Sequence, residues 1–157
     1  MQEIALKRIK IKMVNEHTLK RFIEAQQTHY PIALSEIKAG RKRSHWMWYI
    51  FPQIEGLGFS PTSKFYAIKD MKEAEAFLEH PVLGSRLVAI CNKLLDLEES
   101  NANKIFGSPD DLKLKSSMTL FSLVKNTDPV FGLVLSKFFK GEKDLETVSI
   151  LEKQRSK

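Results

Sequence analysis

The sequence predicts an all-α protein, and three observations support this. Residues that begin and end helices recur along the chain, the apolar residues between them keep helical spacing, and strand-like alternation is nearly absent. The 157 residues are enough for one domain with a sizeable core. With no internal repeat and no low-complexity linker, we expect a compact single-domain array of about six to eight short-to-medium helices.

The first expected helices occupy the N-terminal half. From Thr18 the apolar residues keep helical spacing, Pro31 interrupts the run, and Gly40 ends it as a C-terminal cap. This pattern predicts two helices that share one buried side. Asp70 and Glu73 form a capping-box pattern, which predicts the start of the next helix.

Proline, serine and aspartate mark the later helices. Pro81 begins a helix that carries a long apolar stripe. Ser108 as a cap and Pro109 at the first helical position predict a helix that runs to about Lys125. Two further helices complete the array, with expected starts at Asp128 and Asp144.

The domain organisation is simple. We expect an N-terminal extension over residues 1–16, a single helical domain over residues 17–153 and a C-terminal tail over residues 154–157. The extension interleaves cations with apolar residues and lacks the apolar block of a signal peptide or membrane span. The solitary Cys91 excludes an internal disulfide framework and is expected to be a small buried side chain. These features predict a cytoplasmic protein without membrane association.

Composition and charge exclude several classes of protein. With 43% hydrophobic and 28% charged residues, the chain is neither a disordered nor a fibrous polymer. A net charge of +6 is a modest excess spread along the chain, and a solvated basic surface explains it more simply than a dedicated nucleic-acid surface. Standard motifs for zinc, for dinucleotides, for a P-loop and for serine hydrolases are absent, so no cofactor can be named and no metal is expected.

The segment 40–53, GRKRSHWMWYIFPQ, is the strongest candidate for a working surface. Guanidinium groups bind phosphate oxygens and flat side chains stack on rings, so this segment suits a phosphate-bearing ligand with a ring. Its candidate ligand-binding residues are Arg41, Arg43, Trp46 and Trp48. His45 adds a candidate proton carrier. The alternative, weighted equally, is that the tryptophans anchor the core and the cations are simply solvated.

Polar residues on apolar helix faces complete the candidate pocket. Gln26 shares a face with Phe22 and Tyr30, and its amide either bonds to a neighbouring helix end or, together with Tyr30, contacts a ligand. The later segment adds Asp110, a second tentative catalytic residue, and three candidate ligand contacts: Asp111, Lys113 and Ser117. Helix-start charges and back-bonded hydroxyls are the simpler explanation there. We predict that Gln26, His45 and the segment 110–117 border one cleft.

Five segments carry a resemblance to a known family: RFIEAQ (21–26), GRKRSHWMWYIFPQIEGLG (40–58), YAI (66–68), EHPVLGSRL (79–87) and FGSPDDLKLKSSMTLF (106–121). From about residue 17 to residue 151 the chain resembles the bacterial family often labelled calpastatin, whose function is uncharacterised. The resemblance implies a small, mainly helical fold of its own type and brings no reaction or ligand with it. The label does not fit the chain, because a calpain-inhibitor repeat is disordered until it binds, whereas this sequence predicts several amphipathic helices.

Two functions follow from these residues. The first is binding of, or simple acid-base chemistry on, a small anionic ligand such as a nucleotide or sugar phosphate, in which arginines hold the anion and His45 or Asp110 transfers a proton. The alternative is a non-enzymatic interaction module that binds nucleic acid or a protein partner through its basic surface. We expect a monomer or weak homodimer, and the sequence leaves open whether the protein is an enzyme.

Overall fold

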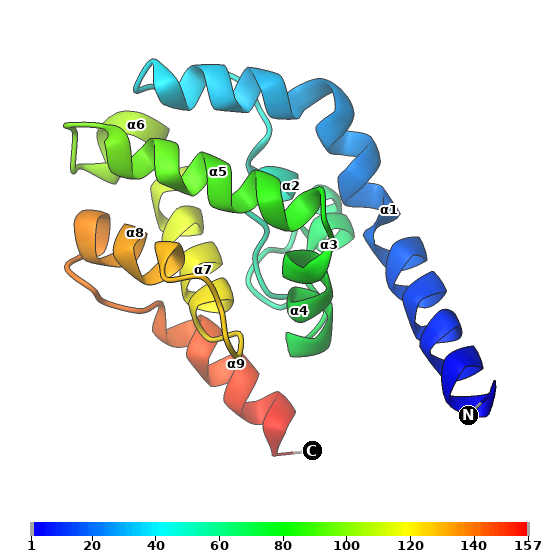
Figure 1. Ribbon diagram of the computed structural model, residues 1–157. Coiled ribbons are helices and arrows are strands. Elements are labelled where there is room, and N and C mark those ends of the chain that lie inside the picture. Colours follow the sequence, from blue (N-terminus) through cyan, green and yellow to red (C-terminus); the bar gives the residue numbers. More distant parts are fainter. Residues whose placement is uncertain (1, 157) are drawn as a thin grey trace.

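The computed structural model describes the backbone of residues 2–156 and the side chains of Ala5 and of residues 18–156. Within this part the chain is all-α, as predicted, with one isolated parallel bridge between Ile54 and Ile68 (Figure 1). The described helices are α1 (Gln2–Lys38), α2 (Met47–Ile50), α3 (Pro61–Tyr66), α4 (Met71–Glu79), α5 (Leu83–Asp96), α6 (Ala102–Phe106), α7 (Asp110–Ser122), α8 (Val130–Phe139) and α9 (Leu145–Arg155).

Helix α1 is one continuous, bent helix, so the prediction of two helices divided at Pro31 was wrong (Figure 1). Proline lacks an N–H and removes one intrahelical hydrogen bond, a loss that a helix can tolerate without ending. Packing holds the two sides together, because Phe22 before the proline and Ile37 after it are both completely buried. The expected end was correct, since Gly40 follows the helix with a positive φ of 81°.

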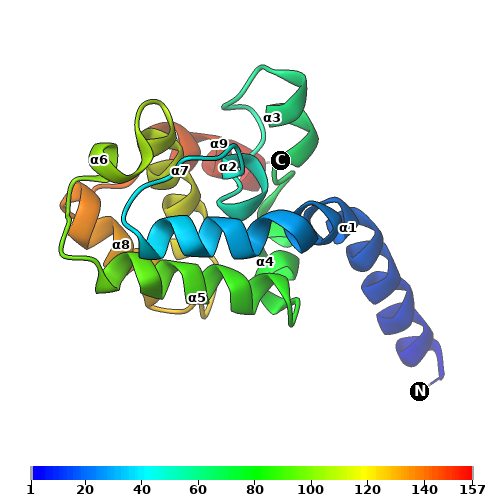
Figure 2. The same cartoon turned by 90° about the horizontal axis from the view of Figure 1, so that it is seen from above.

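The expected N-terminal extension, residues 1–16, is part of α1 from Gln2 onward. Figures 1 and 2 show this part of the helix leading away from the rest of the fold. Met1, Lys157 and, apart from Ala5, the side chains of the extension lie outside the described residues. Helix α9 continues past the expected domain end at residue 153. Among the described helices, none is both long and apolar enough to cross a membrane.

Capping side chains set the starts of several helices. Asp70, as predicted, accepts a hydrogen bond from the backbone N–H three residues later at 2.9 Å. Asp144 does the same at 3.1 Å, and the final helix begins after it, at the predicted start. The expected Ser108 cap was wrong, because Pro109 itself occupies the position before the first helical residue, Asp110, and makes no side-chain capping bond. Helix α7 ends at residue 122, three residues before its expected end near residue 125.

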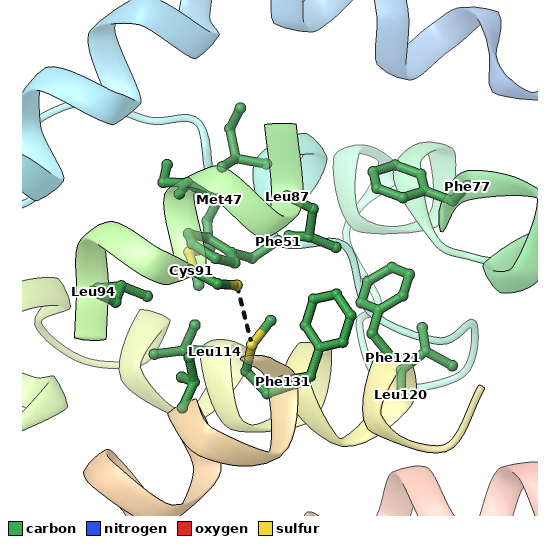
Figure 3. Close-up of a cluster of buried hydrophobic side chains, with 14 of the residues drawn as sticks. Met47, Phe51, Phe77, Leu87, Cys91, Leu94, Leu114, Leu120, Phe121 and Phe131 are labelled. Carbon is green, nitrogen blue, oxygen red and sulfur yellow. Dashed lines mark hydrogen bonds between the residues drawn. The ribbon is translucent and has the colours of Figure 1, made fainter. Parts of the chain in front are cut away.

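The core lies between helices that are distant in sequence. Helix α5 packs against α1, α4 and α8, and α7 packs against α6, α8 and α9. Figure 2 shows α1 and α5 side by side, and Figure 3 shows Phe77, Cys91, Phe121 and Phe131 meeting from four helices. Cys91 is confirmed as buried, its sulfur lies 3.6 Å from that of Met118, and burial raises the pKa of its thiol. Burial of each large side chain stabilises the fold by about 1.5–3 kcal/mol.

Candidate functional site

One carboxylate, Glu36, orders the loop after α1. Its Oε1 accepts hydrogen bonds from the backbone N–H groups of Arg43 (2.8 Å) and Ser44 (3.0 Å) and from the indole N–H of Trp46 (2.8 Å), while Oε2 accepts from the Ser44 hydroxyl (2.6 Å). Burial by itself would raise the pKa of Glu36, but these hydrogen bonds outweigh it and lower the pKa to about 2. The sequence did not single out Glu36, because a glutamate in the last turns of a helix is ordinary.

The central cation of the loop is paired. Nζ of Lys42 lies 2.9 Å from Oδ2 of Asp110 and the Lys42 side chain is only 7% exposed, while Nζ of Lys113 lies 3.5 Å from the other carboxylate oxygen. Lys42 also lies over the ring of Trp46, 5.0 Å from its centroid. Asp110 therefore joins the loop after α1 to the start of α7. The sequence indicated Asp110 and Lys113 as candidate site residues, but it did not distinguish Lys42 from the arginines beside it.

The two tryptophans have different environments. Trp46 is completely buried, which agrees with the alternative interpretation of this residue as a core anchor. Trp48 is half-buried, and Nζ of Lys113 lies 5.3 Å from the centroid of its ring. Two candidate ligand-binding residues, Trp48 and Lys113, are thus brought side by side from α2 and α7.

Trp48 and Lys113 border two adjoining pockets, which we call together the α3–α7 groove. The pocket beside Trp48 is small, and Gln53, Gly58 and Ser63 line both it and the larger pocket. The larger pocket has a volume of about 390 Å³. Its α7 and α9 side is lined by Leu112, Lys113, Lys115, Ser116, Asp144 and Glu146. The groove therefore combines cations, carboxylates, hydroxyl groups and an aromatic ring.

Large apolar side chains are exposed along this groove. Leu112 lines the larger pocket and is 60% exposed, and Leu145 is 79% exposed in an adjoining pocket with Lys115. Phe59, which follows Gly58 of the lining, is 83% exposed. Exposed apolar side chains that gather around a polar groove are typical of binding sites. The sequence did not predict this feature, because apolar residues at helix starts and in loops are indistinguishable from core residues by type.

Gln26 and Tyr30 are engaged with other elements. Gln26 is 2% exposed, its Nε2 donates to the Tyr49 carbonyl at 2.7 Å, and its Oε1 accepts from Arg86 at 3.4 Å. The Tyr30 hydroxyl donates to the Arg86 carbonyl at 3.1 Å. These contacts agree with the structural interpretation of Gln26, in which its amide bonds to a neighbouring helix end. Neither residue lines the α3–α7 groove.

The remaining candidates are dispersed. Arg41, Arg43 and His45 are exposed and do not line the groove. Asp111 accepts a hydrogen bond from the Asn103 amide at 3.2 Å, as a residue of the first helical turn. Ser117 is completely buried, and its hydroxyl has no hydrogen-bond partner among the described residues. Of the candidates, the groove collects Trp48 and Lys113, with Asp110 paired to Lys113. The prediction of one cleft bordered by Gln26, His45 and the segment 110–117 was wrong for Gln26 and His45, because Gln26 is buried against Tyr49 and Arg86 and His45 is exposed away from the groove.

These elements define a small helical domain with a mixed polar and apolar groove. The chain belongs to the family described as "Protein of unknown function (DUF1810)", whose model matches residues 16–151, and this confirms the resemblance to an uncharacterised family. It is similar to the crystal structure of the conserved hypothetical protein Rv1873 from Mycobacterium tuberculosis, with 44% identity and a TM-score of 0.83 over 85% of this chain and 96% of that chain. No curated protein matches the chain.

Proposed function

We propose that the α3–α7 groove binds a small anionic ligand that carries a ring, such as a nucleotide or a sugar phosphate. The observation that carries this proposal is the contact between Lys113 and Trp48, because it places an ammonium group and an aromatic ring together beside a pocket. The pocket volume of about 390 Å³ is within the usual range for small-molecule sites.

The polar lining suits a phosphate group. Lys113 and Lys115 supply ammonium groups that form charge-assisted hydrogen bonds with phosphate oxygens. The Gln53 amide and the Ser63 hydroxyl of the same lining supply neutral donors. Two cations and two neutral donors are thus available to one phosphate group.

The rest of the groove suits a sugar or a base. Asp144 and Glu146 are hydrogen-bond acceptors, which sugar hydroxyl groups and base amino groups require. Leu112 offers exposed apolar surface that a ring can cover. Carboxylates in the lining also disfavour a bare inorganic anion, so they favour a ligand with hydroxyl or amino groups.

We propose binding rather than catalysis. Both oxygens of Asp110 are paired with lysines, so its carboxylate positions Lys113 and is not free to transfer a proton. His45, the other candidate proton carrier, is exposed and does not line the groove. A binding role uses the geometry of Lys113 and Trp48 without requiring a proton carrier.

Isothermal titration calorimetry with a panel of nucleotides and sugar phosphates tests this proposal. We expect saturable binding of at least one compound by the wild type, weakened roughly tenfold by Lys113→Ala or Lys115→Ala, since each removes a charge-assisted bond. Lys72→Ala is the matched control, because Lys72 is exposed on α4 and does not line the groove. No binding by the wild type, or equal weakening by the control, would show the proposal to be wrong.

The exposed cations after α1 favour the second candidate, an interaction module for nucleic acid or a protein partner. The guanidinium groups of Arg41 and Arg43 form no ion pair with any described carboxylate. Fluorescence anisotropy with oligonucleotides at increasing salt distinguishes the two functions. Affinity that falls steeply with salt and is lost in an Arg41→Ala, Arg43→Ala double variant supports the module.

A further inference from the structure

A separate pocket of about 960 Å³ lies between helices α4 and α5 on one side and the loop that joins α7 to α8 on the other. We call it the α4–α8 groove. None of its lining residues lines the α3–α7 groove. The half-buried Leu78 and Val88 give it an apolar floor, and the completely buried Phe131 of the lining also belongs to the core cluster of Figure 3. Its volume is that of a small-molecule site.

The backbone fixes both walls of this groove. At Gly84 a Cβ atom would lie 2.0 Å from the Leu78 carbonyl oxygen, so α5 begins against the end of α4 at a distance that only glycine permits. On the opposite wall the Thr127 hydroxyl donates to the Phe121 carbonyl at 2.8 Å, and Asn126 has a positive φ of 58°. Walls that are ordered without a ligand lower the entropic cost of binding one.

The charges that line the groove are mostly negative, although the whole chain has a net charge of +6. Glu75, Glu79 and Asp128 line it together with a single cation, Lys125. Glu75 and Glu79 are four residues apart on α4, so their side chains are neighbours and their like charges repel. No described lysine or arginine forms an ion pair with any of these three carboxylates.

We propose that the α4–α8 groove binds a linear polyamine. Ammonium groups that are joined by short methylene chains can neutralise the carboxylates of the lining while the methylenes cover the partly exposed Leu78 and Val88. A cation at this place also removes the repulsion between Glu75 and Glu79. An inorganic cation would satisfy the charges but leave the apolar floor in water, so the combined lining selects an organic cation.

Calorimetric titration of the full chain with spermidine at constant ionic strength tests the proposal. We expect saturable binding of one molecule per chain, weakened roughly three- to fivefold by Glu75→Gln or Glu79→Gln. Lys125→Gln is expected to strengthen binding by a similar factor, because it removes a cation from the lining. Glu152→Gln, an exposed residue of α9 that does not line the groove, is the control and leaves the affinity unchanged.

Three results would overturn the assignment. The first is the absence of saturable binding by a wild-type chain whose circular dichroism shows it to be folded. The second is equal weakening by Glu152→Gln, which would indicate general attraction between charges. The third is displacement of spermidine by Mg²⁺ at equal concentration. The Lys125→Gln variant separates an effect on binding from an effect on folding. A variant that only destabilised the protein would not bind spermidine more tightly.

Discussion

The indole N–H of Trp46 donates a 2.8 Å hydrogen bond to Oε1 of Glu36, and this bond joins a completely buried ring to the carboxylate that orders the loop after α1. The same carboxylate accepts the backbone N–H groups of Arg43 and Ser44. A buried anchor and a carboxylate with several donors therefore stabilise one loop together. Loss of either partner is expected to affect both the core and the loop.

Replacement of Glu36 by glutamine is expected to lower the free energy of unfolding by about 1–3 kcal/mol. A neutral amide is a weaker acceptor, and its NH₂ group cannot accept the hydrogen bond from the Ser44 hydroxyl. Urea unfolding at neutral pH measures the change. Glu152→Gln on α9 is the control, and an equal effect of both variants would contradict the assignment.

The contribution of Glu36 is expected to depend on acid pH. Its folded-state pKa of about 2 is below the ordinary value of 4.5, so the folded state binds the proton less readily than the unfolded state. The stabilisation is therefore complete above pH 4.5 and is lost as the pH falls from 4.5 towards 2. In thermal melts across this range, the difference in melting temperature between wild type and Glu36→Gln should become smaller as the pH falls. A constant difference would mean that the carboxylate charge is not the cause.

Trp46 and Arg43 are expected to differ sharply when each is replaced by alanine. Trp46→Ala should destabilise the domain by about 3–5 kcal/mol, because it empties a completely buried site. Arg43→Ala should change stability by less than about 0.5 kcal/mol, since its side chain is exposed and the N–H that bonds to Glu36 belongs to the backbone. Chemical denaturation measures both. Unfolding by Arg43→Ala alone would show that the cation is structural and would count against a ligand-binding surface there.

The pair of Lys42 and Asp110 can be measured by a double-mutant cycle. Asp110→Asn should lower the free energy of unfolding by about 3 kcal/mol. The reason is that the Lys42 ammonium loses its ion-pair partner on a side chain that is only 7% exposed. Lys42→Met should remove that penalty, so the double variant is expected to be more stable than the sum of the single changes predicts. Additive changes would indicate that the two side chains do not interact in solution.

Gly84 and Gly132 form a matched pair of helical glycines. Gly84→Ala should destabilise strongly, because its Cβ atom would lie 2.0 Å from the backbone oxygen of Leu78 and α4 and α5 would have to separate. Gly132→Ala in α8 meets no atom within 4 Å and should stabilise by about 0.4–1 kcal/mol through reduced entropy of the unfolded chain. Melting temperatures compare the two variants, and similar values for both would contradict the close contact.

Ser116 and Ser117 are adjacent in sequence, and their replacement by alanine is expected to change stability in different ways. Ser117→Ala should leave stability unchanged or raise it by about 1 kcal/mol, because the buried hydroxyl has no partner among the described residues. Ser116→Ala should cost about 1 kcal/mol, because its hydroxyl bonds to the Leu112 carbonyl and to Asp144. Thermal unfolding gives both values. Strong destabilisation by Ser117→Ala would reveal a partner in solution.

The predictions that depended on neighbours within one or two helical turns were mostly correct. Asp70 and Asp144 cap their helices, because a cap needs only the backbone N–H groups of the next turn. The prediction that Pro31 divides two helices was wrong, because the outcome there depends on contacts with distant elements. The helix continues through Pro31 because burial of residues on both sides of it outweighs the lost hydrogen bond, and that burial depends on other helices.

The sequence by itself determined the all-α class and the buried state of Cys91, because these follow from residue type and helical period. It left open whether the tryptophans anchor the core or bind a ligand. Only the tertiary structure decided that Lys42 is the paired cation, that Glu36 orders the loop and that Lys113 lies against Trp48. Helical spacing states which side chains share a face but not which distant element covers that face. Contacts between elements therefore required the folded chain.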